Sequence, residues 1–566
     1  MSRQRDNAAA ETTLPSSATR STGERAMRIV VAVIATALCV IPLRAQETVN
    51  QSNAASADEV RELRQLVQEL KAKVDRLEKN AAPQPAPPIS SNYDARAEVV
   101  VPRESLVPET KAESQPQAAA PEKPQKAEPF AFADWTWLNG TPRTKTPAFD
   151  SKFFTPEIRA DVDYIYDFHH PKDDTISGSS EVFRSNEIQV TQLGVGGDFH
   201  YDNVRARLMT QFGMYSTTTP RNDASPSRGQ WDLANAYRYL TEAYGGYHFN
   251  PLHGINVDAG IFVSYIGLFS YYNFDNWAYQ PSYVSSNTPW FFNGVRVQIY
   301  PTEHLKIEPW FVNGWQSYGR FNNRPGVGGQ ILWRPNGWLS ILGNQYALGA
   351  DALNTPGRIR YHTDDSIEVK YYDNPQKFIS KAAFSLTGDA GCEHGGGVSC
   401  VGNSVKIING ERVVWPKQSF LGYMLYNRLW FAKDKYGLTL GGGKINNPGR
   451  YLVLLPPING ATATSGTPYF TENPGDPYKA WDASATFDYM PSQYITFRWE
   501  YNHRAANVPY FSGSGGVTPP GGNQGTAGSF VCLSGFTTCN GSPTNTWFPD
   551  LRKTENRATI AILVKF

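Results

Sequence analysis

Residues 481–504 read WDASATFDYMPSQYITFRWEYNHR. Apolar and polar side chains alternate on both sides of residues 491–493, whose composition is that of a tight turn. A period of two residues predicts β-strands with one apolar and one polar face. The same alternation recurs at residues 158–166, 204–212, 255–263 and 558–566. The part of the chain after about residue 150 is therefore predicted to be all-β.

The connections between these stretches alternate in length. Tight turns are predicted at residues 200–203, 250–254, 301–304, 335–337, 373–376, 433–435 and 491–493. Long segments lie between them, at about 168–186, 215–237, 267–290, 317–327, 347–364, 388–417, 446–480 and 503–555. Such a pattern joins about 16 strands, with short turns at one end and long loops at the other. It is typical of a transmembrane, antiparallel, up-and-down β-barrel, predicted over residues 150–566.

Composition excludes several other classes of protein. The chain has 566 residues, and 53 Lys and Arg against 52 Asp and Glu give a net charge of +1. This balance provides no overall electrostatic field that would attract nucleic acid. The mean hydropathy of -0.44, and the lack of an apolar run of about 18 residues, exclude a polytopic helical membrane protein.

A soluble β-sandwich would show the same alternation. Aromatic residues near the strand ends, such as Tyr247 and Trp430, favour the barrel, because membrane interfaces attract amphipathic rings. Closure also satisfies every backbone group, as hydrocarbon demands. In such a barrel the outward side chains Val204, Ile261 and Phe497 are expected to face lipid.

Three segments precede the predicted barrel. Residues 1–45 contain an apolar run of about 13 residues after Arg25 and Arg28, which predicts a signal peptide. In residues 46–80, apolar side chains spaced by three and four predict a short periplasmic coiled coil, with a single solvated helix as the alternative. Residues 81–149 are predicted to form a Pro-rich linker.

Removal of the signal peptide leaves four cysteines, Cys392, Cys400, Cys532 and Cys539. They form two close pairs in Gly- and Ser-rich stretches, which in an exported chain predicts two local disulfides. A metal site using Cys392, Cys400 and His394 is the weaker alternative, because an oxidising compartment favours the disulfide. No metal or other cofactor is therefore predicted.

Charged side chains of both signs share the face opposite the apolar one. A water-filled lumen explains so many inward charges at lower cost than a closed core. The pore-lining candidates are Arg205, Arg207, Arg238, Glu242, Asp258, Arg296, Lys306, Glu308, Arg498 and Glu500. Each of them is also compatible with a solvated wall position that has no part in selectivity.

The last strand ends at Phe566 and looks like the signal by which the barrel-assembly machinery recognises outer-membrane proteins of Gram-negative cells. The order of segments resembles that of the OmpL-like putative β-barrel porin family, and residues 273–283 (NFDNWAYQPSY) and 288–294 (TPWFFNG) are similar to a stretch of that family. The resemblance covers about residues 130–566 and implies a porin.

Resemblance to general porins implies that the third long loop, residues 267–290, folds into the channel and narrows it. The constriction candidates are Tyr271, Tyr272, Asp275, Trp277 and Tyr279. Their rings are compatible both with a packed aromatic cluster and with a surface that binds sugars. The same resemblance implies a homotrimer.

These observations predict an outer-membrane porin for passive diffusion of small hydrophilic solutes, with the coiled coil in the periplasm. Its expected partners are outer-membrane lipids, the barrel-assembly machinery and the solutes, and not nucleic acid. The sequence contains no short catalytic motif, so no enzymatic activity is predicted. Two alternatives remain: an envelope protein that contacts the cell wall through the coiled coil, and a barrel enzyme of the lipase or protease type.

Overall fold

A computed structural model describes most of the chain after residue 127. The described residues are 128–172, 174–176, 182–220, 223, 225, 231–350, 355–402, 404–415, 417–447, 478–507, 510–514, 538–539, 542–543 and 551–566. The predicted signal peptide, the predicted coiled coil, residues 81–127 of the predicted linker, and Cys532 lie outside these residues.

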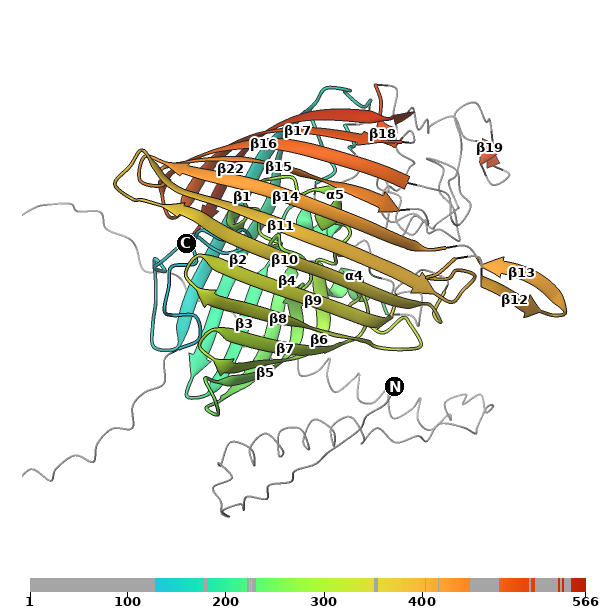
Figure 1. Cartoon of the computed structure of the whole chain (residues 1–566), viewed down its shortest axis with the longest axis horizontal. Helices are drawn as coiled ribbons and strands as arrows, with labels where there is room; N and C mark the ends of the chain where they lie inside the picture. Colours follow the sequence, from blue (N-terminus) through green and yellow to red (C-terminus); the bar gives the residue numbers. More distant parts are fainter. Residues whose placement is uncertain are drawn as a thin grey trace, which may run out of the picture. The chain divides into compact units, whose positions relative to one another are not determined.

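Sixteen strands of the described residues form one closed antiparallel barrel (Figure 1). They are β1 (Phe154–Asp167), β2 (Ile188–Tyr201), β3 (Val204–Thr210), β4 (Leu240–Phe249), β5 (Ile255–Val263), β6 (Phe291–Thr302), β7 (Leu305–Val312), β8 (Gly326–Asn336), β9 (Leu339–Gly349), β10 (Ile359–Asp373), β11 (Ile379–His394), β14 (Ser419–Phe431), β15 (Tyr436–Asn447), β16 (Tyr478–Ser492), β17 (Ile495–Ala506) and β22 (Thr554–Lys565). Strand β1 pairs with β22 and closes the sheet. The predicted all-β barrel of 16 strands is confirmed.

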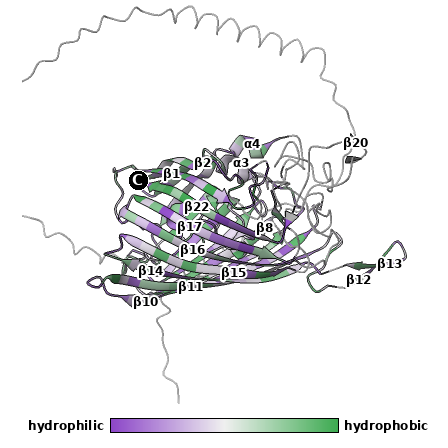
Figure 2. Cartoon of the chain, turned by 90° about the horizontal axis from the view of Figure 1, so that it is seen from above, coloured by the Kyte–Doolittle hydropathy of each residue, from purple (hydrophilic) through white to green (hydrophobic). Residues whose placement is uncertain are grey.

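The two-residue period sets the two faces of each strand. In β16, Trp481 and Phe487 are exposed on the outer face, whereas Asp482 and Asp488 are buried on the inner face. Apolar and polar residues alternate along the strands in the same way in Figure 2. The outer face of the barrel is therefore largely apolar and its inner face largely polar, as hydrocarbon outside and water inside require.

The two ends of the barrel differ as predicted. Each of the seven predicted tight turns joins two neighbouring strands at one end, here called the short-turn end. The long connections lie at the opposite, long-loop end (Figure 1). They contain elements too short to give a periodic sequence signal: α3 (Tyr215–Thr218), α4 (Leu233–Tyr237), η3 (Asn273–Asp275), α5 (Tyr283–Ser286), β12 (Ser404–Ile408), β13 (Glu411–Trp415), β18 (Phe511–Ser512), β19 (Thr538–Cys539), β20 (Ser542–Pro543) and β21 (Leu551–Arg552). No helix in the described part of the chain is long and apolar enough to cross a membrane.

One outward position departs from the predicted lipid contact. Val204 is 58% exposed, whereas Ile261 is only 4% exposed. Tyr237 of α4 and Tyr318 of the β7–β8 loop pack with Phe291 over Ile261. Ile261 therefore contacts protein rather than lipid, because loops from the long-loop end cover the upper part of this wall.

Residues 128–149, predicted as the end of the linker, pack against the short-turn end of the barrel. The Phe130 amide donates to the carbonyl of Glu303, in the β6–β7 turn, at 2.8 Å. The Arg143 guanidinium donates to the carbonyl of Ser492 at 2.6 Å and to Thr496 Oγ1 at 2.8 Å, at the β16–β17 turn. Residues 130–146 of this segment are called the strap. The strap crosses from one side of the barrel to the other.

Candidate functional site

The β5–β6 loop, residues 264–290, folds into the barrel. All five constriction candidates in it are buried, namely Tyr271, Tyr272, Asp275, Trp277 and Tyr279. Asp275 accepts from Arg159 of β1, Tyr279 donates to Asp161 of β1, and Tyr272 donates to Glu242 of β4. The loop thus occupies part of the lumen, the place that the resemblance to general porins implies for it.

Inward carboxylates on β16 and β17 hold the backbone of this loop. Glu500 accepts hydrogen bonds from the amides of Tyr279, at 2.6 Å, and Gln280, at 2.8 Å. Asp482 accepts from the amide of Tyr283 at 3.0 Å and from Ser282 Oγ at 2.8 Å. A loop inside a barrel must find partners for its backbone groups, and these carboxylate oxygens accept hydrogen bonds from three of its amides.

Arg498 holds the carbonyl groups of the same loop. Its guanidinium donates to the carbonyls of Asn273 at 3.0 Å, Asn276 at 2.6 Å and Ala278 at 3.1 Å. It also forms a two-point ion pair with Asp488, at 2.7 and 3.0 Å. Arg498 is only 2% exposed and Glu500 only 4%. These two pore-lining candidates point inward, and both lie against the loop rather than beside open lumen.

Tyrosine hydroxyls attach the loop to the opposite wall. Tyr271 donates to Gln211 Oε1 at 2.6 Å and Tyr272 to Glu242 Oε2 at 2.7 Å. Burial and the nearby Glu242 carboxylate raise the pKa of Tyr272, which keeps its hydroxyl protonated as a donor. The Tyr271 ring packs on Tyr215 with centroids 4.6 Å apart, and this contact favours the packed aromatic cluster over a sugar-binding surface.

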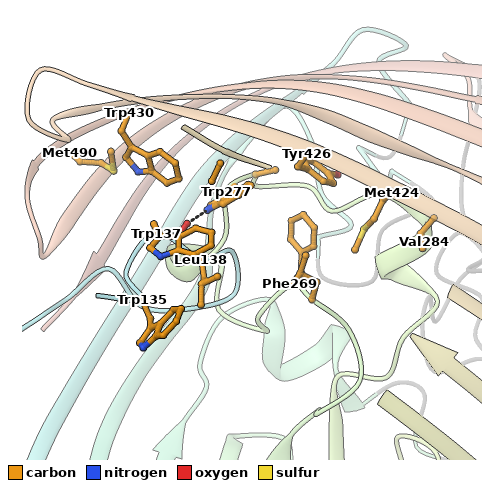
Figure 3. Close-up of a cluster of buried hydrophobic side chains, with 13 residues drawn as sticks. Trp135, Trp137, Leu138, Phe269, Trp277, Val284, Met424, Tyr426, Trp430 and Met490 are labelled. Carbon is orange, nitrogen blue, oxygen red and sulfur yellow. Dashed lines mark hydrogen bonds between the residues drawn. The ribbon is translucent and has the colours of Figure 1, made fainter. Parts of the chain in front are cut away.

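The strap supplies aromatic side chains to the same interior. Trp135, Trp137 and Leu138 pack in one buried cluster with Trp277 of the loop and Trp430 of β14 (Figure 3). Complete burial of one Trp contributes at most about 4–6 kcal/mol by surface area. Burial of these side chains therefore stabilises the position of the strap inside the barrel.

Hydrogen bonds to backbone carbonyls join the strap directly to the loop. The indole nitrogen of Trp277 donates to the carbonyl of Trp137 at 3.1 Å (Figure 3). The amide of Gly140 donates to the carbonyl of Asp275 at 3.1 Å. The loop and the strap therefore form one continuous unit inside the barrel. Sequence reasoning missed the strap, although the apolar cluster at Trp135, Trp137 and Leu138 is unlike the polar linker before it.

The wall formed by β3–β7 carries most of the other pore-lining candidates. Asp258 lies between Arg205, at 3.3 Å, and Arg296, at 3.0 Å. Arg207 pairs with Glu242 at 2.7 Å. The remaining pair is Lys306 with Glu308. Positive and negative side chains thus alternate over this wall.

This wall retains some solvent access. The Arg205 side chain is 30% exposed, and the other cations of the wall are partly exposed. A cavity of ≈ 310 Å³ opens beside it, lined in part by Arg205, Tyr244, His248 and Asn256. An aromatic ring also stabilises one cation of the wall, because the Arg296 guanidinium lies 4.6 Å from the centre of the Tyr244 ring in a cation–π contact.

Arg238 is the candidate that lies away from the wall strands. It follows α4 at the long-loop end and donates to the carbonyl of Ser216 and to Thr217 Oγ1, both at 3.3 Å. Its contacts are with the β3–β4 loop.

The structure joins Cys392 and Cys400 in a disulfide, with Cα atoms 5.1 Å apart, at the base of the β12–β13 hairpin. Cys539 is in the short strand β19, and its predicted partner Cys532 is outside the described residues. In the part of the chain that the structure describes, no group of three or more His, Cys, Asp or Glu side chains is arranged to hold a metal ion.

Several solved outer-membrane proteins are similar in structure to this chain. The outer membrane channel DcaP of Acinetobacter baumannii has 12% sequence identity and a TM-score of 0.39, over 74% of this chain and 100% of that chain. An anion-selective porin from Comamonas acidovorans has 9% identity and a TM-score of 0.41, over 73% and 99% of the two chains. OprB of Pseudomonas putida has 10% identity and a TM-score of 0.40, over 73% and 94%.

No curated protein matches the sequence. A protein-family comparison matches residues 159–533, more than half of the chain, and these residues include the β5–β6 loop and the charged wall. The chain belongs to the family described as putative beta-barrel porin-2, OmpL-like.

Proposed function

We propose that this outer-membrane barrel is a porin through which small hydrophilic solutes diffuse passively. The observation that carries the proposal is the charged wall of β3–β7, which places ion pairs, with Arg205 30% exposed, inside a barrel whose outer face is apolar. Removing ions from water costs several kcal/mol each, roughly, so a wet lumen explains their position best. A 16-stranded barrel is wide enough for an aqueous channel.

The path of the solute runs between the charged wall and the loop. The loop is held on the side of β16 and β17, through Glu500 and Asp482, and the strap reaches β10 through Glu368. The loop also reaches the charged wall where Tyr272 donates to Glu242, so the passage is proposed to run past that contact, beside Arg205 and the cavity. Because its charges are paired, the field within it is close to balanced, which suits neutral hydrophilic solutes.

Liposome swelling tests this function. Proteoliposomes diluted into isotonic solutions of neutral sugars are expected to swell at rates that fall as the sugar mass rises, because the constricted passage filters by size. A dextran too large to enter should cause no swelling and serves as the control. Swelling no faster than that of protein-free liposomes would contradict the proposal.

The proposed partners follow from the same barrel. Outer-membrane lipids contact the apolar outer face, and the barrel-assembly machinery recognises the last strand, whose terminal Phe566 is exposed and hydrogen-bonds to Ile158. A homotrimer, and a periplasmic coiled coil in residues 46–80, remain part of the proposal. The cell-wall tether and the barrel enzyme remain alternatives, and no specific contact in the described residues favours either of them.

A further inference from the structure

The strap lies across the short-turn end of the lumen and is held at three places. Its beginning bonds to the β6–β7 turn through Phe130, and its end bonds to the β16–β17 turn through Arg143. Its middle enters the barrel, where Trp137, Leu138 and Asn139 are buried. A segment held on opposite sides of a barrel and buried at its centre reduces the cross-section of the lumen.

Asn139 joins the strap to both the wall and the loop. Its backbone amide donates to Glu368 Oε1, on β10, at 2.9 Å. Its side-chain oxygen accepts from the amide of Trp277 at 2.7 Å. One residue thus fixes the distance between the β10 wall and the constriction loop, and each of these bonds is buried.

We propose that the strap is the second half of the constriction, and that Asn139 and Glu368 are positioning residues that set the size limit of the channel. The inference rests on the proposed porin function. It assigns the limiting cross-section to two segments that are more than 100 residues apart in the sequence, the strap and the loop of residues 264–290.

The contacts of the strap differ from those of a simple brace for the sheet. The barrel closes through the β1–β22 ladder, which runs from the pair Arg159 and Lys565 to the pair Asp167 and Arg557 without any strap residue. A spacer that only led into β1 would have no need to enter the lumen. The strap instead buries its aromatic side chains against the loop, where they fill space that solutes would otherwise use.

The strap also covers charges on β8 and β10. The Arg334 guanidinium lies 4.7 Å from the Trp135 ring centre, and the Lys370 ammonium lies 5.7 Å from that of Trp137. Together with Glu368, these groups are inward charges beneath the strap. Displacing the strap would therefore widen the lumen and expose two cations and one carboxylate to the passing solute. The ion selectivity of the channel would then shift toward anions.

The test uses single-channel recording of the full-length protein. The first variant combines Trp137→Ala with Asn139→Ala and removes the aromatic contact and the side-chain acceptor for the Trp277 amide. The second, Glu368→Ala, removes the acceptor of the Asn139 backbone amide on β10. Both are expected to raise conductance by roughly twofold or more and to admit larger polyethylene glycols. Glu368→Gln keeps an acceptor oxygen and should retain the small size limit. Phe149→Ala, at a 64% exposed aromatic just after the strap, is the matched control.

The outcomes separate this inference from the function on which it rests. If the wild-type protein conducts, and the strap variants have the same conductance and the same size limit as the wild-type protein, the inference is overturned. If neither wild-type nor variant protein conducts, the porin proposal itself fails. Heat-modifiable migration in gels reports whether each variant has formed its barrel, and Glu368→Gln distinguishes loss of the acceptor from loss of the fold.

Discussion

Replacement of Arg498 by Ala is expected to release the constriction loop and to raise the single-channel conductance roughly twofold or more. The guanidinium satisfies three loop carbonyls, those of Asn273, Asn276 and Ala278. Each buried carbonyl left without a partner costs about 1–3 kcal/mol. Residues 273–278 are then expected to move into water while Glu500 and Asp482 still hold residues 279–283, so the passage widens and the current becomes noisier.

The same substitution also removes one partner of Asp488. Arg428 still contacts Asp488 at 2.8 Å, so the carboxylate keeps one cation. Breaking a buried pair costs about 3–5 kcal/mol, and the remaining partner reduces that loss. The sixteen-stranded ladder is unchanged, so the barrel should persist while the loop moves.

Arg205→Ala is the matched control for Arg498→Ala. Arg205 is a partly exposed inward arginine of β3 whose ion pair is with Asp258 of β5, on the same charged wall and away from Arg498. Its loss should leave the loop in place and change conductance far less. Equal conductance of Arg498→Ala and wild-type channels would show that the loop does not narrow the passage.

Replacement of Asp258 by Ala is expected to make the channel prefer anions. This carboxylate lies between Arg205 and Arg296 and neutralises part of their charge. Without it, two guanidiniums face the passage with less compensation. The reversal potential in a KCl gradient should therefore shift toward that of chloride, and the shift should shrink in 1 M salt, where the screening length is about 3 Å.

Asp258→Asn separates charge from packing. Asn keeps an oxygen acceptor for Arg296, so it should show the same direction of selectivity with a smaller loss of stability in urea unfolding. The loss for Asp258→Ala should be about 3–5 kcal/mol, the usual cost of breaking a buried pair. An unchanged reversal potential in both variants would mean that permeating ions do not pass the charged wall.

The sequence predicted the barrel well because the barrel is a periodic structure. A period of two residues, together with alternating short and long connections, is a direct consequence of strands that cross a membrane and turn back. The resemblance to the OmpL-like family is confirmed by the match of residues 159–533. The two-residue alternation alone also placed Arg498 and Glu500 on the inner face.

The rest depends on contacts between segments that are distant in the chain. The alternation along a strand cannot show that Arg498 and Glu500 bind the loop, because the loop lies more than 200 residues earlier. It also cannot show that loops cover Ile261 on the outer face. The strap follows a Pro-rich stretch and has no period, so composition grouped it with the linker. Its few aromatic residues were the available signal.

Planar-bilayer recording of the purified wild-type protein tests most directly whether water and ions fill this barrel. An aqueous passage beside β3–β7 predicts discrete, uniform current steps that scale with salt concentration. A membrane that stays electrically tight at high density of folded protein would contradict the account, because the charged wall would then line a closed interior.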